Sequence, residues 1–231
     1  MDNLDNLNQN KLKAHKIVCI IPTLNESLTV TEVVKKAKQF VHRVIVVDGY
    51  SEDGTSEMAS KAGADVIFQD GKGKGTALRT ALNKIYGDIY VTIDGDATYD
   101  PLEMEKILKP IIEGEADMVV GSRLKGMMEK GSISKLNKIG NKLFNFLINT
   151  FFHGNITDSQ SGFRALNRGA VESLQLTSEG FEIETEMTVK CLKLGLKIME
   201  VPISYMRRRG SQTKLNAFKA GSKILKTIIF S

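Results

Sequence analysis

The 231-residue chain contains no tryptophan, two cysteines and three histidines. Cys19 and Cys191 have neither the spacing of metal ligands nor the number needed for a disulfide framework, so we expect buried thiols in a reducing compartment. His15, His42 and His153 cluster with no other candidate ligand or nucleophile in the sequence. These absences argue against a zinc site and against a catalytic triad.

Long apolar segments are also missing. No run of eighteen apolar residues occurs, so we expect no segment that spans a bilayer. The start, MDNLDNLNQN, is polar and acidic, unlike a secretory signal. The turn PTLNE (22–26) lacks the glycine fingerprint of NAD-dependent oxidoreductases. The net charge of +5 is mild, and no nucleic-acid partner is expected.

The chain does contain a regular alternation of short β-rich runs and helical patterns. Strands are expected at 16–22, 43–49, 64–69, 88–94, 116–122 and 197–205. Helices are expected at 27–40, 55–62, 71–85 and 101–113. This order predicts an α/β fold, a Rossmann-like and mostly parallel sheet with flanking helices. Ligands bind such sheets at the carboxyl ends of the strands, and polar residues follow five of the predicted strands.

Two helical segments in the second half carry lysines beside large apolar residues. In the segment 133–154 the lysines are Lys135, Lys138 and Lys142, and in a tail helix near 214–230 they are Lys219, Lys223 and Lys226. An ordinary core helix with solvated lysines is one interpretation. Two such helices in one chain favour the other, a pair of amphipathic helices that lie on a membrane surface.

The stretch VTIDGDATYDP (91–101) ends a predicted strand with Asp94 and Asp96. Two carboxylates at this spacing can bind Mg²⁺ or Mn²⁺, which prefer oxygen ligands and share them with substrate phosphates. A solvated Asp-Gly turn is the simpler interpretation of the motif alone. The polar ends of the neighbouring strands favour the metal and diphosphate site.

Three further motifs are ambiguous when each is taken alone. GKGKG (71–75) could cradle phosphates at a helix N-terminus, or it could be a flexible helix start. Asp48 could bind a ribose or base, or it could begin an Asp-Gly turn. The run Arg207 to Arg209 suits phosphate binding, and equally a solvated basic loop.

As an ordered set, the motifs resemble the family 2 inverting glycosyltransferases of GT-A fold, specifically the dolichyl-phosphate sugar synthases of the archaeal N-glycosylation branch. The matching stretches are IPTLNE (21–26), VVDGYSEDGT (46–55), GKGKGTAL (71–78), TIDGDATYDP (92–101), VVGSRL (119–124), DSQSGFRAL (158–166), GFEIETEM (180–187) and VPISYMRRRGSQTKL (201–215). They extend over almost the whole chain.

The resemblance implies a role for each matching residue. The nucleotide sugar is bound by Pro22, Thr23, Asn25, Glu26, Asp48, Gly73, Lys74, Asp94 and Asp96. The phosphate and acceptor side is formed by Arg123, Asp158, Gln160, Ser161, Glu182, Glu184, Arg207, Arg209 and Lys214. Asp94, Asp96 and Arg123 are the implied catalytic residues. Asp96 is the stronger metal ligand, with Mg²⁺ or Mn²⁺ as the cofactor, and Asp94 is the second ligand.

The chain departs from the family pattern at two positions. Many relatives have a second aspartate where this chain has Gly49, so we expect different nucleoside contacts. The mannosyl members often have a glutamine metal ligand where this chain has Thr98, so we expect a different metal shell. The resemblance also implies four segments: a polar arm (1–15), a nucleotide-sugar-binding half (16–125), an acceptor-binding half (126–215) and an amphipathic C-terminal helix (216–231).

The implied reaction is an inverting, metal-dependent transfer of one sugar from UDP-GlcNAc, UDP-glucose or GDP-mannose to dolichyl phosphate, which feeds protein N-glycosylation. It would take place at the cytoplasmic face of the cell membrane, with the enzyme bound peripherally. A phosphate monoester is largely ionised at neutral pH and needs no general base, consistent with the missing histidine base. Two alternatives stay open: a sugar-phosphate nucleotidyltransferase and a non-catalytic nucleotide-binding membrane adaptor.

Overall fold

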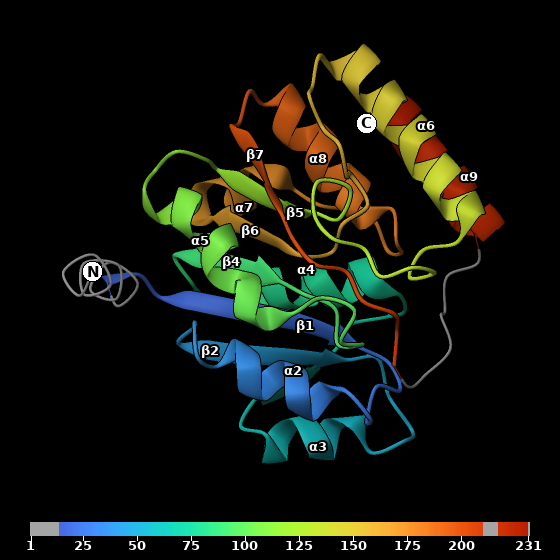
Figure 1. Ribbon diagram of the computed structural model, residues 1–231. Helices are drawn as coiled ribbons and strands as arrows, with labels where there is room; N and C mark the ends of the chain where they lie inside the picture. The colour runs from blue at the N-terminus through green and yellow to red at the C-terminus, as the bar shows by residue number, and fades with distance from the viewer. Residues whose placement is uncertain (1–13, 210–216, 231) are drawn as a thin grey trace.

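A computed structural model describes residues 14–209 and 217–230, which form one seven-stranded sheet with helices on both faces (Figure 1). The strands are β1 (Ile17–Thr23), β2 (Arg43–Asp48), β3 (Asp65–Phe68), β4 (Ile89–Thr92), β5 (Met118–Ser122), β6 (Arg164–Asn167) and β7 (Ile198–Pro202). Their order across the sheet is β3-β2-β1-β4-β6-β5-β7. Only β6 is antiparallel to its neighbours among these strands. The predicted α/β fold with a mostly parallel sheet is therefore confirmed.

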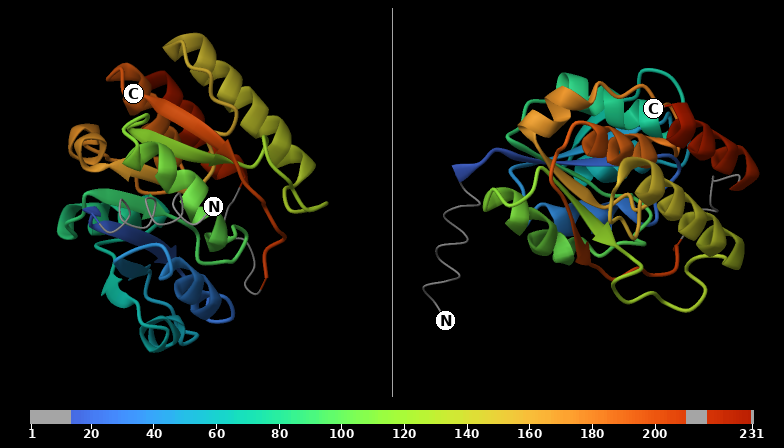
Figure 2. Two further views of the ribbon diagram at one scale, coloured as in Figure 1. Left: turned by 60° about the vertical axis from the view of Figure 1, so that its left-hand side comes forward. Right: turned by 90° about the horizontal axis from the view of Figure 1, so that it is seen from above.

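The helices cover the sheet in two layers. They are α2 (Val30–Ala37), α3 (Thr55–Lys61), α4 (Lys74–Lys84), α5 (Met104–Ile112), α6 (Lys135–Phe152), α7 (Arg168–Leu174), α8 (Ile183–Lys193) and α9 (Ala217–Phe230), with a 3₁₀ turn, η1 (Pro101–Glu103). Helices α2, α3 and α5 pack on one face, and α4, α7 and α8 pack on the other. Figure 2 shows this layering from two further sides.

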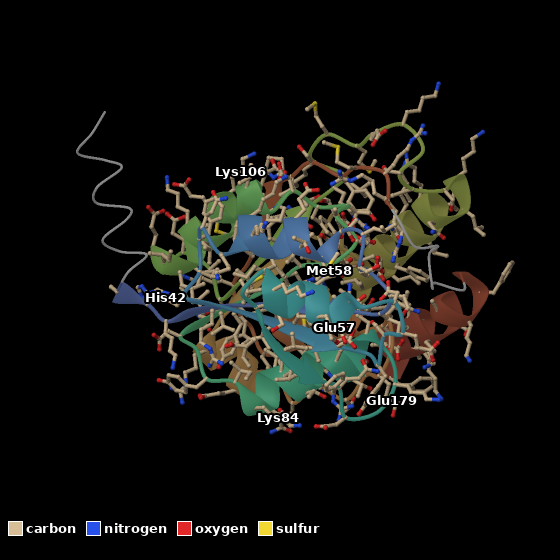
Figure 3. The ribbon with its side chains drawn as sticks, turned by 90° about the horizontal axis from the view of Figure 1, so that it is seen from below. His42, Glu57, Met58, Lys84, Lys106 and Glu179 are labelled. Carbon is tan, nitrogen blue, oxygen red and sulfur yellow. The ribbon has the colours of Figure 1, made fainter. Side chains whose placement is uncertain are left out.

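The parallel register brings polar strand ends to one edge of the sheet. Thr23 at the end of β1 pairs in register with Asp48 at the end of β2. Strand β6 runs the other way, so the chain that precedes Arg164 lies at this same edge. His42 lies at the opposite edge, where its Nδ1 accepts a hydrogen bond from Ile17 N (3.2 Å). Figure 3 shows His42 far from Glu179, whose carbonyl contacts the start of α4. His42 therefore lies away from the polar edge.

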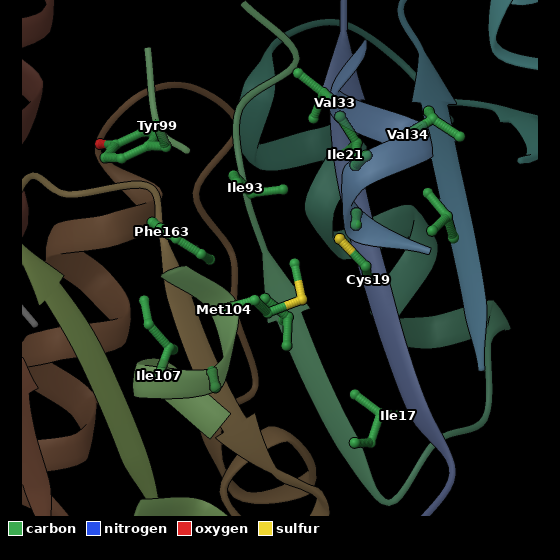
Figure 4. Close-up of a cluster of buried hydrophobic side chains, with 14 of the residues drawn as sticks. Ile17, Cys19, Ile21, Val33, Val34, Ile93, Tyr99, Met104, Ile107 and Phe163 are labelled. Carbon is green, nitrogen blue, oxygen red and sulfur yellow. The ribbon is translucent and has the colours of Figure 1, made fainter. Parts of the chain in front are cut away.

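The core follows from the alternation of side chains along the strands. In β1, Ile17, Cys19 and Ile21 face α2 and α5 (Figure 4), while the residues between them face α4. Cys19 and Cys191 are buried free thiols, as expected, and burial raises the pKa of Cys191 to about 12. The hydrophobic effect on both faces keeps the sheet fixed and its polar edge in place.

Several local elements differ from the sequence predictions. Helix α2 begins at Val30 rather than near Ser27, because Asn25 has a positive φ of 54° and the chain turns through Thr29 N to Glu26 O (3.0 Å). Strand β6 and helix α7 were not predicted. Strand β7, from the predicted acceptor-binding half (126–215), pairs with β5, from the predicted nucleotide-sugar-binding half (16–125). One sheet therefore contains strands from both predicted halves.

Helices α6 and α9 lie side by side at one end of the molecule (Figures 1 and 2). They are joined through Ile148 of α6 and Ile224 and Ile228 of α9, which pack on Val189 of α8. Within the described part of the chain, no helix is both long and apolar enough to cross a membrane.

Candidate active site

A cavity of about 280 Å³ lies at the carboxyl ends of β1, β2, β3 and β4. It is lined by Pro22, Thr23, Leu24, Glu26, Gly49, Gln69, Gly73, Lys74, Ala77, Asp94, Gly95, Asp96, Phe181 and Arg208. Seven residues of this lining belong to the nucleotide-sugar set expected from the sequence: Pro22, Thr23, Glu26, Gly73, Lys74, Asp94 and Asp96. Two larger hollows, of about 400 and 450 Å³, lie elsewhere on the described chain and contain neither Asp94 nor Asp96.

Lys74, at the first turn of α4, joins two acids from distant parts of the chain. Its Nζ lies 2.5 Å from Asp94 Oδ1 and 2.7 Å from Glu184 Oε1. Burial works to lower the pKa of Lys74, but the charges of Asp94 and Glu184 outweigh burial and raise it. The lysine is therefore a permanent cation that holds Asp94 against α8.

Gly162, which lies in the DSQSGFRAL stretch but was given no role from the sequence, makes room for this ion pair. A Cβ at Gly162 would lie 2.8 Å from Lys74 Nζ and 3.0 Å from Asp94 Oδ1. A side chain there would push the two charged groups apart. The QSG sequence before β6 was the available signal, but its meaning depends on the unpredicted strand.

Asp96 is enclosed by hydrogen bonds on both of its oxygens. Its Oδ1 accepts from Thr98 N (3.1 Å) and Thr98 Oγ1 (2.7 Å), and its Oδ2 accepts from Arg208 Nη1 (2.8 Å). Arg208 also pairs through Nη2 with Glu26. Burial and the neighbouring charge of Asp94 raise the pKa of Asp96, against the opposing effects of Thr98 and Arg208.

Each of the two cavity cations therefore bridges a pair of acids, and of these four acids Glu26, Asp94 and Asp96 line the cavity. Lys74 bridges Asp94 and Glu184, and Arg208 bridges Asp96 and Glu26. Such a surface suits a ligand that brings both anionic phosphate groups and a divalent cation.

Of the three consecutive arginines at 207–209, one lines this cavity. Residues 205–209, here called the strap, lie beside the Asp96 loop, since Tyr205 forms a β-bridge with Tyr99 and Met206 N donates to Thr98 O (2.8 Å). Arg208 faces the cavity, whereas Arg207 and Arg209 line the hollow of about 400 Å³ on the other side. There they pair with Glu129 (3.5 Å) and Glu32 (2.7 Å). Arg207 and Arg209, expected on the phosphate and acceptor side, therefore do not line this cavity, and Lys214 lies outside the described residues.

Asp48 and Asn25, both expected to bind the nucleoside, are engaged within the protein. The fully buried Asp48 carboxylate accepts from Thr23 Oγ1 (3.1 Å) and from Ser51 N (2.9 Å). Asn25 Oδ1 accepts from Glu52 N (2.9 Å). Neither residue lines the cavity, and the bonds of the Asp48 carboxylate and of the Asn25 amide oxygen hold the chain at the ends of β1 and β2.

The GKGKG segment forms a packing contact rather than an open phosphate cradle. The first turn of α4 is occupied by a backbone carbonyl, since Thr76 N donates to Glu179 O (3.1 Å). A Cβ at Gly75 would lie 2.5 Å from Ser178 O, and one at Gly73 would overlap Glu179 O. These glycines let the 178–180 turn pack directly on the helix start.

Several residues expected on the acceptor side form a network that does not line the cavity. Arg123 makes a two-point ion pair with the fully buried Asp158 (2.7 and 2.7 Å) and lies over the ring of Tyr205. Gln160 Nε2 donates to Thr185 Oγ1 (2.7 Å). Among the described residues of this group, only Glu184 is linked to a cavity acid, since Lys74 bridges it to Asp94.

The 123–158 network is held by a buried acid that the sequence did not indicate. Glu200 of β7 accepts hydrogen bonds from Thr157 N and Asp158 N (2.9 Å each) and pairs with Lys125 (3.0 Å). Ser161 Oγ donates to Gly121 O (2.6 Å), which ties the same loop to β5.

Comparison with known proteins identifies the family of the chain. The family described as Glycosyl transferase family 2 matches residues 18–175. The chain belongs to glycosyl transferase family 2. The match includes all four strand ends that form the cavity, and the protein is a glycosyltransferase.

Curated relatives and solved structures agree with this assignment. Glycosyltransferase AglJ of Haloferax volcanii is 41% identical over 212 residues, 90% of this chain and 69% of AglJ. A UDP-N-acetylglucosamine–dolichyl-phosphate N-acetylglucosaminyltransferase of Methanococcus voltae is 31% identical over 234 residues, 90% of this chain and 92% of the relative. Glucosyl-3-phosphoglycerate synthase of Mycobacterium tuberculosis, solved with Mn²⁺, UDP and glucosyl-3-phosphoglycerate, has a TM-score of 0.77 and 25% identity, covering 96% of this chain and 81% of that one. The predicted GT-A fold and the family resemblance are confirmed.

Proposed function

We propose that this family 2 glycosyltransferase moves one sugar from a nucleotide sugar to dolichyl phosphate, with inversion at the anomeric carbon and with the help of Mg²⁺ or Mn²⁺. The observation that carries the proposal is the cavity whose two cations each bridge a pair of acids, in a chain whose relatives include a dolichyl-phosphate sugar transferase. The product would feed protein N-glycosylation.

The cavity residues support a nucleotide-sugar donor. Gly49 and Gln69 lie at the β2 and β3 side, and Asp94 and Asp96 lie at the β4 side. A nucleoside at the first side would direct its diphosphate toward the second. There, Lys74 and Arg208 provide positive charge for the departing diphosphate.

The residues also fit a divalent cation. Mg²⁺ in such enzymes is usually bound by one or two carboxylates together with substrate phosphates, and Asp96 with Asp94 can supply that number. In the structure, the positively charged guanidinium of Arg208 is paired with the Asp96 carboxylate. A bound ion would neutralise charge on the leaving diphosphate. Thr98, which orients Asp96, supplies no carboxamide ligand of the kind expected for mannosyl members.

A phosphate acceptor suits the side chains around the cavity. Each cavity carboxylate is already engaged by Lys74 or Arg208, so none is arranged as a dedicated proton acceptor. An ionised phosphate attacks without losing a proton, and the protein needs only to bind and orient it. Inversion follows from direct attack on the face opposite the leaving group.

The α6 and α9 surface supports binding to the cytoplasmic face of a membrane. Large apolar side chains are exposed along both helices: Leu136, Ile139, Leu143 and Phe146 on α6, and Phe218, Leu225 and Ile229 on α9. Exposed lysines accompany them, including Lys138, Lys142 and Lys226. Apolar and basic groups on one surface fit an anionic lipid interface, where a dolichyl chain would be located.

The transfer reaction is tested with dolichyl phosphate, Mg²⁺ or Mn²⁺ and a panel of UDP- and GDP-sugars, followed by mass analysis of the lipid extract. We expect one lipid species to gain a single hexose or N-acetylhexosamine, and the anomeric configuration of the product to be opposite to that of the donor. Asp96→Ala should abolish the product. If no lipid gains a sugar with any donor or metal, the proposed reaction is wrong.

Membrane binding is tested by sedimentation with anionic phospholipid vesicles. Phe146→Glu should reduce binding by about tenfold, since it replaces an exposed apolar side chain, which would insert into the lipid interface, with a negative charge. Met58→Glu is the matched control, because Met58 is exposed on α3, away from α6 (Figure 3). Equal binding of the two variants would contradict the membrane-surface assignment.

A further inference from the structure

Arg208 belongs to the strap and differs from the two neighbouring arginines in the hollow that it lines. Arg208 lines the cavity, whereas Arg207 and Arg209 line the hollow of about 400 Å³, together with Met206. Its side chain is 26% exposed, whereas the side chain of Lys74 is 13% exposed. Of the two cations at the site, Arg208 is the more accessible to solvent.

The contacts of Arg208 coincide with the position where a cation would bind. Asp96 Oδ1 is occupied by two hydrogen bonds from Thr98, so Oδ2 is the oxygen that Arg208 holds. A divalent ion that uses Asp96 Oδ2 has to compete with the guanidinium. Two positive charges at one carboxylate oxygen repel each other, so ion binding favours departure of Arg208.

A guanidinium released from a carboxylate can pair with phosphate instead. Arginine binds carboxylate and phosphate oxygens with the same planar, two-point geometry. Lys74 is fixed differently, because it sits on α4 and stays between Asp94 and Glu184. The exchange of partners is therefore expected of Arg208 and not of Lys74.

We infer that Arg208 is an exchangeable counter-ion: it neutralises Asp96 and Glu26 before ligand binds, and it pairs with a ligand phosphate once a divalent cation binds Asp96. This inference rests on the proposed metal-dependent function. It predicts that the cation and the phosphate ligand assist each other's binding through Arg208. The phosphate could belong to the nucleotide diphosphate or to the acceptor.

The experiment measures Mn²⁺ affinity by electron paramagnetic resonance of the free ion, without lipid or sugar transfer. Without nucleotide, Arg208→Gln should bind Mn²⁺ about tenfold more tightly than the wild type, because the competing charge is gone. With saturating UDP, the gain in Mn²⁺ affinity should be about tenfold smaller in Arg208→Gln than in the wild type. Methyl phosphate in place of UDP tests the acceptor phosphate as the source.

Two further variants make the result specific. Lys36→Gln removes a positive charge from the other side of the strap, where Lys36 pairs with Glu32 and Asp100, and should leave both affinities unchanged. Arg208→Lys keeps the charge but loses the two-point geometry, so it should resemble the wild type without nucleotide and lose part of the UDP effect. Circular dichroism melting checks that each variant is folded, and Arg208→Lys carries the test if Arg208→Gln is not.

Equal Mn²⁺ affinity of the wild type and Arg208→Gln without nucleotide would overturn the inference. So would equal gains with UDP in both proteins, or failure of the wild type to bind Mn²⁺ with UDP present. A gain with UDP but none with methyl phosphate would assign the exchange to the nucleotide. Failure of the lipid assay, with these Mn²⁺ differences observed, would reject the acceptor and leave the Arg208 exchange standing.

Discussion

Thr98 Oγ1 donates a hydrogen bond of 2.7 Å to Asp96 Oδ1, and Thr98 N donates a second one of 3.1 Å to the same oxygen. The threonine thus fixes the orientation of the acid that is proposed to bind the cation. The carbonyl of Thr98 also receives Met206 N (2.8 Å), which ties the strap to the Asp96 loop. Thr98, where the chain departs from the mannosyl relatives, therefore connects the Asp96 loop to the strap.

Thr98→Val should weaken Mn²⁺ binding and slow transfer by about tenfold, because a hydrogen bond to a charged group contributes about 1.5–3 kcal/mol. The backbone N–H would still hold Asp96, so activity should not vanish. Thr150→Val is the control, since Thr150 Oγ1 bonds only the helix carbonyl of Phe146 on α6. Unchanged kcat and Mn²⁺ affinity in Thr98→Val would show that the hydroxyl does not position Asp96.

Lys74→Met should lower the free energy of unfolding by about 3–5 kcal/mol, because it leaves two carboxylates near each other without their cation. Urea unfolding followed by circular dichroism measures the change. The double variant Lys74→Met/Glu184→Gln should recover part of the loss, since only Asp94 then stays charged. A double variant that is less stable than Lys74→Met would contradict the bridging role.

Glu186 should make the stability depend on acid pH. Thr177 N and Ser178 N donate to its carboxylate (2.9 and 2.8 Å), and Lys190 pairs with it (2.7 Å). Burial works to raise the pKa of Glu186, but Lys190 and the two N–H groups outweigh burial and lower it to about 2. A lowered pKa stabilises the folded protein above the unfolded value of about 4.5, and this contribution is lost as the pH falls toward 2.

In Glu186→Gln, the free energy of unfolding should therefore fall less steeply between pH 4.5 and pH 2 than in the wild type. Urea unfolding at a series of pH values measures the slope. Glu57→Gln, an exposed acid on the outer face of α3 (Figure 3), is the control and should keep the wild-type slope. A wild-type slope in Glu186→Gln would reject this source of acid sensitivity.

Gly75→Ala should destabilise the protein by about 1–3 kcal/mol, because the new methyl group would meet backbone atoms that cannot rotate away. The nearest is Ser178 O, which would lie 2.5 Å from the new Cβ. Gly140→Ala on α6 is the matched control, because its nearest neighbour, a ring atom of Phe144, lies at an ordinary 3.7 Å. We expect a lower Tm for Gly75→Ala alone, and an equal Tm in both variants would contradict the packing argument.

The sequence predicted the strands that run in parallel and the edge where their polar ends meet. Buried β-branched runs such as those around Val46 and Val119 carry that information locally, since their length and composition suit a strand covered on both faces. Asp94 and Asp96 were recognisable for the same reason, because the end of a buried strand is visible in the sequence. Strand β6 was not predicted, because RALN has no alternation and gains its pairing only from β4 and β5.

The partners of the site residues depended on contacts between distant segments. Arg207, Arg208 and Arg209 are chemically identical, and only the register of the strap on the 96–98 loop decides that Arg208 faces the cavity. GKGKG looks like a phosphate loop in isolation, but a carbonyl from residue 179 occupies the helix start.

The sequence by itself determined the fold class, the polar edge and the family, since each depends on local patterns of burial and on ordered motifs. Only the tertiary structure decided that Lys74 joins Asp94 to Glu184 and that Arg208 joins Asp96 to Glu26. Three of these four ion pairs join residues more than a hundred positions apart, and such pairs depend on tertiary packing that the local sequence does not specify.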